Sequence, residues 1–351
     1  MGVLELKYKK NIPKRKFGMH SNNPALHFLV QAPKLLKNDA ILCLIQPSGP
    51  LLYQKDEDFK RAVFGGNKLL QILDFTKLAD VLWGEKTVAT AAIFLQKCLP
   101  DKEDVVHIVA NRTFSNVNKI FLELGHYDFH IVTQDVALSN RTIWKSNLIG
   151  GGRLVGLVDR LFKIRTLKKF LETKLDNGWK AGEGFIYSEN GKPHNYITGQ
   201  PYIPAKALTK DKLDEDEIRP CETELFHRPT SELIYTPPHI LIRANIGVEK
   251  LIAHISDKYL VFRNKIIGIH APQNQRNELE KLLHYLRDES SLLRFWILNT
   301  SSQIKVKRHT VPMTEDFMNI PYPDNLAEIK TSSSEKILIN GHLEKLILFN
   351  T

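Results

Sequence analysis

The sequence predicts an α/β fold in the first part of the chain and a mixed α+β region in the second. Short aliphatic runs recur along residues 39–132, and segments with helical periodicity separate them. The first run, DAILCLIQPSG, has five aliphatic residues among the six from Ala40 to Ile45 and ends on a polar turn. Such a run is typical of a strand that is buried on both faces of a parallel sheet.

The elements of the first part follow in order. Asn23 is expected to cap a helix opened by Pro24, and Pro33 is expected to kink or shorten that helix. Residues 56–75 predict a helix that leads into a strand, and residues 89–97 predict a second buried strand. DVVHIVA and HIVTQ are expected to form a third and a fourth strand.

The pattern changes near residue 151. Apolar residues at 154, 157, 158, 161 and 162 predict an amphipathic helix, which we interpret as the start of a connector between two domains. Beyond it, Asn190-Gly191 favours a type I′ hairpin turn, and HILIRANI, LIAHI, YLVFR and KIIGIHA are short β-like runs. Leucines at 279, 282, 283 and 286 mark a helix, and TSSSEK predicts a linker. The predicted divisions are a first domain (1–150), a helical connector (151–190), a second domain (191–325) and a C-terminal linker and tail (326–351).

The composition favours a polyanionic partner, with nucleic acid the first candidate. There are 49 Lys and Arg against 39 Asp and Glu, a net charge of +10. A merely basic soluble protein remains the alternative. Cys43, Cys98 and Cys221 are odd in number and far apart, which suits a reducing cytoplasm and predicts neither a disulfide framework nor a zinc site. The N-terminus lacks the apolar core of a signal peptide, and no stretch is apolar enough to cross a membrane, so no membrane partner is expected.

Motifs for chemistry are scarce. GGGR at 150–153 lacks the spacing of a phosphate-binding loop and is better explained as a hinge. Ser48-Gly49 lies outside a G-x-S-x-G elbow, no H-E-x-x-H is present, and we find no nuclease motif, so neither a catalytic residue nor a metal site is predicted. Lys305 and Lys307 would point the same way on an extended segment, next to Arg308, and would suit phosphate contacts. A solvated surface is the alternative for these three.

Six segments together resemble a known family. In order they are FLVQAPKLLKNDAILCLIQPSG, KLLQILDFTKLADVLWGEKTVATAAIFLQK, QPYIPAKAL, HILIRANIG, YLVFRNKIIGIHA and IPYP. They resemble the distal half of adenine-N6 DNA methyltransferases of restriction-modification systems that carry a C-terminal target-recognition domain. The resemblance covers roughly residues 20–325. It implies a partial Rossmann-like methyltransferase sheet, followed by a mixed α+β target-recognition (specificity) domain that binds double-stranded DNA.

The resemblance also implies roles for particular residues. These enzymes extrude the target base, and an aromatic side chain stacks on it; the matching residue is Trp83. Pro47 and Ser48 would lie beside the adenine pocket. The alternative for Trp83 is packing at the start of a strand. In the second domain, the types of side chain that contact guanine and adenine edges are Arg243, Asn245, Arg263 and Asn264. Arg243 could instead be a buried structural partner, because it shares a strand face with Leu241.

The chain also departs from the family. It has no Asn-Pro-Pro-aromatic loop and no glycine-rich strand-to-helix turn before residue 39; SNNPALHF contains only Asn23-Pro24. We therefore expect a truncated, cytoplasmic DNA-binding fragment that is inactive alone and is completed by a complementary methyltransferase chain. S-adenosylmethionine is expected only in that assembled enzyme. The alternatives are a non-catalytic specificity subunit that recruits a complete methyltransferase, and a decayed gene remnant.

Overall fold

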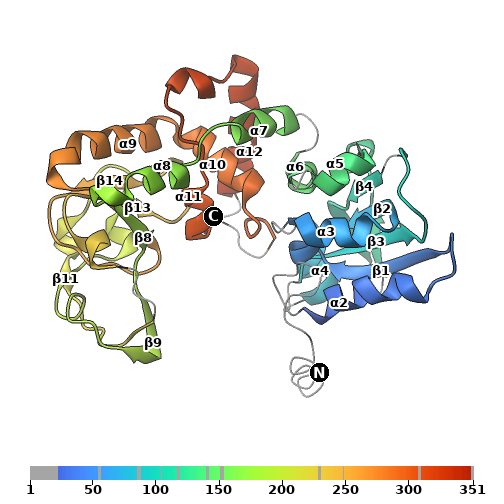
Figure 1. The fold of residues 1–351 in the computed structure, drawn as a ribbon, viewed down its shortest axis with the longest axis horizontal. Coiled ribbons are helices and arrows are strands. Elements are labelled where there is room, and N and C mark those ends of the chain that lie inside the picture. The colour runs from blue at the N-terminus through green and yellow to red at the C-terminus, as the bar shows by residue number, and fades with distance from the viewer. Residues whose placement is uncertain are drawn as a thin grey trace. The chain divides into compact units, whose positions relative to one another are not determined.

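A computed structural model of the 351-residue chain describes residues 23–53, 57–84, 88–103, 105–116, 119–139, 142–150, 154–227, 231–247, 249–306 and 310–348. The protein is mixed α/β, with several small sheets (Figure 1). It divides into two compact units. Unit 1 is Met1–Val158 with Ser302–Arg308, and unit 2 is Asp159–Ser301 with His309–Thr351.

Unit 1 is built on a five-stranded sheet in the order β1-β3-β2-β4-β7. β2 and β4 run parallel, and the other neighbouring pairs are antiparallel, so the expected parallel sheet is instead mixed. The aliphatic runs correctly predicted the positions of all five strands. These are β1 (Ile41–Pro47), β2 (Lys68–Asp74), β3 (Thr90–Gln96), β4 (Val105–Val109) and β7 (Phe129–Val132).

The helices of unit 1 pack on one face of this sheet. α2 (Pro24–Gln31), α3 (Glu57–Phe64), α5 (Gln134–Ser139) and α6 (Ile143–Ile149) share one apolar core with strand residues such as Ile72. The other described elements of this unit are short. They are the helical turns Ala32–Leu35, Gly49–Tyr53, Thr76–Leu78 and His126–Asp128, the helix α4 (Ala79–Trp83), and the hairpin of β5 (Arg112–Asn116) and β6 (Lys119–Glu123).

The start of α2 confirms the predicted cap. Asn23 Oδ1 accepts a hydrogen bond from Ala25 N at 3.0 Å, and Pro24 stands at the first helical position. The α-helix ends at Gln31, before Pro33, and continues as a 3-10 turn. Pro33 therefore shortens the helix, as its missing N–H predicts.

The second face of the unit 1 sheet is partly open. In the register of the strands, Ile41, Cys43 and Ile45 of β1 share this face with Phe129 and Ile131 of β7. Ile41 is 60% exposed, Ile45 58% and Ile131 65%. We name these five residues the open face. The expected burial of the first strand on both faces is wrong, because among the described residues β1 is an edge strand that pairs only with β3.

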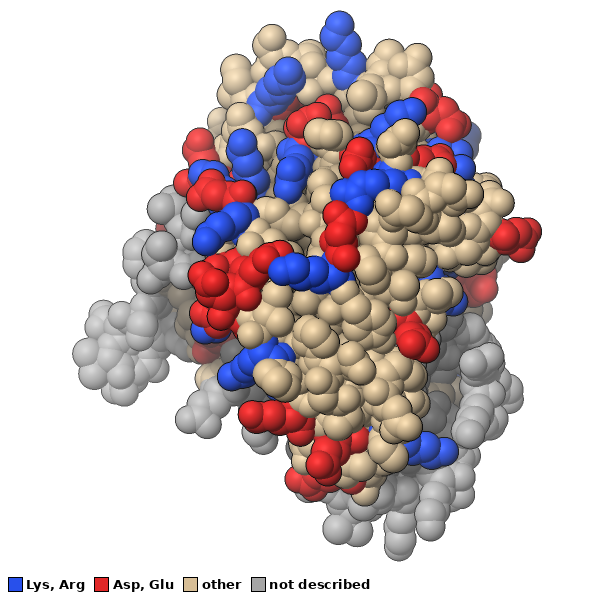
Figure 2. All heavy atoms as spheres, turned by 90° about the vertical axis from the view of Figure 1, so that its left-hand side faces the viewer, with Lys and Arg blue, Asp and Glu red and all other residues tan. Residues whose placement is uncertain are grey.

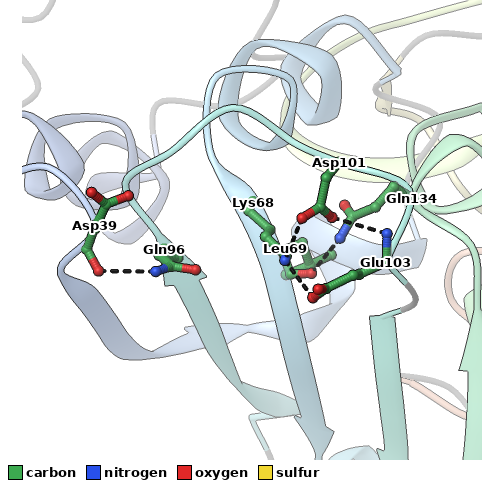
Figure 3. A network of polar contacts seen from close by, with 7 residues as sticks. All are labelled: Asp39, Lys68, Leu69, Gln96, Asp101, Glu103 and Gln134. Atoms are coloured by element: carbon green, nitrogen blue, oxygen red, sulfur yellow. Dashed lines mark hydrogen bonds and ion pairs between the residues drawn. The ribbon is translucent and has the colours of Figure 1, made fainter.

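A polar cluster fixes the amino end of β2 (Figure 3). Lys68 donates to Asp101 at 2.6 Å and to Glu103, and Glu103 N donates to Asp101 Oδ1 at 2.9 Å. Gln134 Nε2 donates to Leu69 O at 2.7 Å. The loop that precedes β4 and the first turn of α5 are therefore both hydrogen-bonded to β2.

Unit 2 is organised around a four-stranded antiparallel sheet in the order β14-β13-β15-β8. The central strand, β13 (His239–Arg243), pairs with β14 (Ala253–Ser256) and β15 (Ile266–His270), and β15 pairs with β8 (Lys180–Glu183). The expectation that HILIRANIG and YLVFRNKIIGI supply adjacent strands is confirmed for the HILIR and IIGI parts, which lie in β13 and β15. The helix predicted from four leucines is α9 (Arg276–Asp288), which contacts β13 and β14 (Figure 1).

The remaining elements of unit 2 surround this sheet. The helices are α8 (Leu167–Thr173), α10 (Ser290–Thr300), α11 (Thr314–Met318) and α12 (Ser333–Leu348), and two short ladders join β9 (Ile186–Lys192) to β12 (Phe226–His227) and β10 (Pro201–Tyr202) to β11 (Arg219–Pro220). α7 (Val155–Phe162) is the predicted amphipathic helix, and the boundary between the units falls within it. Gly151, Gly152 and Arg153 of the GGGR segment lie outside the described residues.

Three local predictions in this unit are wrong. β9 runs straight through Asn190 and Gly191, so these two residues form no hairpin turn. YLVFR makes only isolated bridges, and most of the predicted TSSSEK linker belongs to α12, which begins at Ser333. A distant segment can decide the local structure: β9 pairs with β12.

Candidate nucleic-acid interface

In unit 1, the three candidate pocket residues meet at the carboxyl end of β1. Pro47 pairs with Thr90 in the β1–β3 ladder, and Ser48 N donates to Ala89 O at 3.0 Å. Trp83, at the end of α4, donates from Nε1 to Thr90 Oγ1 at 2.9 Å. Its side chain remains 44% exposed. The exposed surface is compatible with stacking on a base, and the bond to Thr90, the first residue of β3, is equally compatible with packing at the start of a strand.

Ser48 lies below this surface and does not line it. Its side chain is fully buried and shares a hydrogen bond of 2.7 Å with the Thr76 hydroxyl. Thr76 N in turn donates to Asp74 Oδ1 at 2.9 Å. The role of Ser48 is therefore to join the end of β1 to the end of β2 from within.

Asp74 is the centre of a buried polar network that the sequence did not predict. Tyr53 Oη donates to its carboxylate, and His107 Nε2 of β4 lies 3.4 Å from Asp74 Oδ2. Asp74 and His107 are both fully buried. The opposite nitrogen, His107 Nδ1, is 3.1 Å from Asn147 Nδ2 of α6.

The surroundings of Asp74 set its charge. Burial alone would raise the pKa of this carboxyl, but the contacts from His107, Thr76 and Tyr53 outweigh burial and hold its pKa below the usual value. Burial and the nearby Asp74 charge raise the pKa of Tyr53 well above its ordinary value. The network therefore contains a carboxylate and a neutral phenol at neutral pH. It ties together β1, β2, β4 and α6 under the exposed Trp83.

In unit 2, the structure brings the four predicted base-contacting residues to one end of the sheet. Arg243 ends β13, and Ala244 N donates to Lys265 O at 2.9 Å, which places the turn 263–265 beside it. Asn264 N donates to Phe185 O at 3.1 Å, and the Arg263 guanidinium carbon lies 5.9 Å from the centre of the Phe185 ring. Asn245 follows two residues after Arg243, and its Oδ1 accepts from Gly247 N at 2.8 Å.

The cations at this end of the sheet form no ion pair within the described part of the chain. They are Arg243, Lys250, Arg263 and Lys265, which we name the basic edge. Lys250 and Lys265 were not predicted; the backbone pairing of 243 with 252 and of 244 with 265 brings them in. Arg243 is half-buried, while the other three side chains are exposed. The intermediate exposure of Arg243 fits neither a fully buried structural partner nor a fully solvated side chain.

Several other cations on unit 2 are neutralised. Lys206, Lys210 and Lys258 form ion pairs of 2.6 to 2.7 Å with Glu217, Glu249 and Glu215, and Arg276 pairs with Asp257 and Glu280. Figure 2 shows one face of the molecule on which Lys and Arg side chains lie next to Asp and Glu. A polyanion is attracted to cations that lack such partners, and the basic edge gathers four cations without a described ion pair at one end of a sheet.

The structure gives no support to the predicted cation group of Lys305, Lys307 and Arg308. Lys307 and Arg308 lie outside the described residues. Lys305 has a left-handed backbone (φ 59°) and a half-buried side chain whose pKa burial lowers. The extended strand or loop expected for Lys305 is therefore wrong at this residue.

Two other surveys bear on the class of site. No helix among the described residues is long and apolar enough to span a membrane. Nor do the described His, Cys, Asp and Glu side chains form a group of three or more that could hold a metal ion.

The comparisons with known proteins gave matches among solved structures alone. No protein-family model matches the sequence, and no curated protein matches it. Three solved structures are similar over most of this chain. The type IIG restriction endonuclease BpuSI aligns with a TM-score of 0.30 and 10% identity over 99% of this chain and 47% of its own. The type IIL restriction-modification enzyme MmeI, in complex with DNA, aligns with a TM-score of 0.36 and 9% identity over 92% and 48%.

The HsdS subunit from Thermoanaerobacter tengcongensis aligns with a TM-score of 0.23 and 12% identity, over 88% of this chain and 92% of its own. The chain thus spans about half the length of the two restriction enzymes. At these TM-scores the comparisons name what the chain is similar to and assign it no activity.

Proposed function

We propose that this chain is the DNA-binding, specificity-bearing part of a site-specific adenine-N6 DNA methyltransferase of a restriction-modification system. The basic edge carries the proposal, because four cations without described acidic partners converge with two asparagines on one end of a rigid sheet. Cations of this kind contact phosphates, while Arg and Asn side chains contact base edges. The resemblance of the sequence to target-recognition domains supports the same assignment.

DNA binding is expected to depend steeply on salt through the basic edge. Replacing Arg263 and Lys265 by alanine should lower the slope of log K against log [salt] by roughly two units, because each phosphate contact contributes about 0.9. The measurement is fluorescence anisotropy with a duplex of mixed sequence between 50 and 300 mM salt, concentrations on the order of those that reveal counterion release.

The matched control replaces Lys206 and Lys258, which are exposed but paired with Glu217 and Glu215. This variant removes the same number of positive charges and is expected to keep the wild-type slope. A wild-type slope near zero, or equal losses in the two variants, would contradict the assignment of the basic edge.

The methyl-transfer part of the proposal needs a second polypeptide. The buried network of Ser48 and Asp74 at the carboxyl ends of β1 and β2 supports placing the S-adenosylmethionine site on another chain. On this proposal the complementary chain binds S-adenosylmethionine and supplies the Asn-Pro-Pro-aromatic loop. The unpaired edge of β1 and the open face offer it a strand edge and an apolar surface, and such surfaces mark protein contacts.

Co-expression with that chain is expected to yield N6-methyladenine in DNA, which nuclease digestion and mass spectrometry of nucleosides detect. Trp83→Ala should lower kcat/KM by roughly 10- to 100-fold, since stacking on a base contributes about 1–3 kcal/mol. Trp83→Phe keeps a ring and should recover most of the loss. The alternative is a non-catalytic specificity subunit. It would be supported if this chain bound only a methyltransferase that already has the glycine-rich turn and the Asn-Pro-Pro-aromatic loop.

A further inference from the structure

We propose that Ser290 and Arg294 of α10 are positioning residues that set the sequence specificity of the basic edge. They lie one helical turn apart and hold the loop formed by residues 243–247 and 249–252, which we name the recognition loop. This inference rests on the proposed function, because it takes the recognition loop as a DNA-contacting segment.

Side chains of α10 bind both limbs of the recognition loop. Arg294 Nε donates to Ile246 O at 2.9 Å, and Nη1 donates to Glu249 O at 2.6 Å. Ser290 Oγ accepts from Leu251 N at 2.6 Å. These three bonds join a helix to the main chain of the loop, so they fix its shape independently of the loop's own side chains.

The remaining bonds of the loop transmit this constraint to the candidate base contacts. Arg243 N donates to Ile252 O at 2.9 Å and closes the loop at its base. Ile246 N donates to Thr310 O at 2.9 Å, while Asn245 Oδ1 accepts from Gly247 N. The peptide groups on both sides of Asn245 are therefore held, and the directions in which Arg243 and Asn245 leave the main chain follow from them.

The placement of Arg294 is costly, which argues that it has a use beyond filling space. The residue is 1% exposed, and its contacts are carbonyl oxygens with no described carboxylate in ion-pair distance. Nη2 is buried with no hydrogen-bond partner among the described residues. Burial lowers the pKa of this guanidinium to about 10, with the Glu249 charge opposing the shift. An apolar side chain would fill the same space without these costs.

The two carbonyl oxygens that accept from Arg294 belong to different limbs of the recognition loop. A guanidinium can bind both at once, because its donors lie in a plane and point in fixed directions. Lysine carries the same charge, but its three donors radiate from one nitrogen and not from a planar fork, so it can hold one of the two limbs well and the other poorly. We therefore expect the charge alone to be insufficient and the fork geometry to matter.

The test is selection of bound duplexes from a random-sequence DNA library by the full chain, followed by sequencing. Wild type should enrich one sequence. Arg294→Met should reduce the affinity ratio of that sequence over a scrambled duplex by about tenfold or more, the value of one good base contact. Its non-specific affinity and salt slope should stay at the wild-type level, since the basic edge is intact. Arg294→Lys should fall between the two.

A merely structural role would lower specific and non-specific binding together, as the folded fraction falls. Arg276→Met is the matched control, because it removes a guanidinium at the far end of β14, where Arg276 pairs with Asp257. It should leave the ratio unchanged. Thermal unfolding and circular dichroism of each variant record whether it is folded.

If Arg294→Met does not fold, Ser290→Ala replaces it in the test, because it removes one hydroxyl from the same contact. The expected loss of the affinity ratio is then a few-fold, and an unchanged ratio overturns the inference. If folded Arg294→Met keeps the wild-type affinity ratio, the positioning role is overturned as well. The proposed function would not be affected by that result. Failure of wild type to enrich any sequence refutes the proposed function and this inference together.

Discussion

Asp74→Ala is expected to destabilise unit 1 by about 3–5 kcal/mol, the usual result of removing one member of a buried charged network. The carboxylate accepts from Thr76 N and Tyr53 Oη and faces His107, and the alanine variant leaves these groups buried without a partner. Hydrogen exchange of β2 and β4 amides, followed by mass spectrometry in a urea series, reports on unit 1 separately from unit 2.

The same carboxylate predicts an acid-sensitive contribution. The pKa of Asp74 is lowered in the folded protein, so its contribution is fully present above the unfolded pKa of about 4 and is lost as the pH falls through the lower, folded pKa. Asp74→Asn keeps the shape and one acceptor, and should cost about 1–3 kcal/mol at pH 7. This variant should also lose less stability than wild type as the pH falls below about 4, the ordinary pKa of an aspartate.

Asp101→Ala is the control, because Asp101 is an exposed carboxylate whose pKa its bond to Lys68 lowers. It should change unit 1 little, since exposed ion pairs contribute little. If Asp74→Ala and Asp101→Ala had similar effects, Asp74 would not be the centre of the network that supports Trp83.

The sequence predicted the positions of the unit 1 strands better than their environment. Aliphatic runs are local, and each run at residues 41–47, 68–74 and 90–96 became a strand. Direction and coverage depend on pairing partners far along the chain. An edge strand with an uncovered face has the same composition as a buried one, so Ile41 and Ile45 gave no sign of their exposure.

Gly191 illustrates how a local pattern can have a different cause. Asn-Gly favours a tight turn, but here the glycine lies in β9, where an added Cβ would stand 2.6 Å from the main chain of Phe226. The glycine therefore permits a close approach of two segments. Nothing within the neighbouring residues indicates that approach, because Phe226 belongs to β12.

In the candidate interface, too, local sequence predicted some residues, while others depend on contacts with distant segments. Arg243, Asn245, Arg263 and Asn264 were predicted from side-chain type, and the sheet brings them to one end. The bonds of Arg294 to the recognition loop could not be predicted, because they join α10 to main-chain oxygens 45 to 48 residues earlier in the sequence. Asp74 ends an apolar run and looks like a solvated turn residue until Tyr53 and His107 are placed around it.

Gly184→Ala is expected to disrupt unit 2 at the basic edge. A Cβ at this position would lie 2.1 Å from Phe262 O and 2.6 Å from the carbonyl carbon of Arg263, and both are main-chain atoms. Neither can move alone, because Phe185 N donates to Phe262 O at 3.0 Å and Gly184 N donates to Ile266 O at 3.0 Å. The variant must shift the whole turn 263–265, at a cost of about 3 kcal/mol, near the upper end for overpacking.

Calorimetry should show this as a fall of roughly 2–4 °C in the Tm of unit 2 for each kcal/mol lost. DNA affinity should fall as well, because the displaced turn carries Arg263 and Lys265. Gly341→Ala is the matched control in the same unit: Gly341 lies within α12 with no atom within 4 Å of an added Cβ. Alanine suits a helix better than glycine by about 1 kcal/mol, so this variant should be slightly more stable and bind DNA normally. A Gly184→Ala protein with wild-type Tm and affinity would show that the turn 263–265 is not held against Gly184 and that its cations need no fixed position.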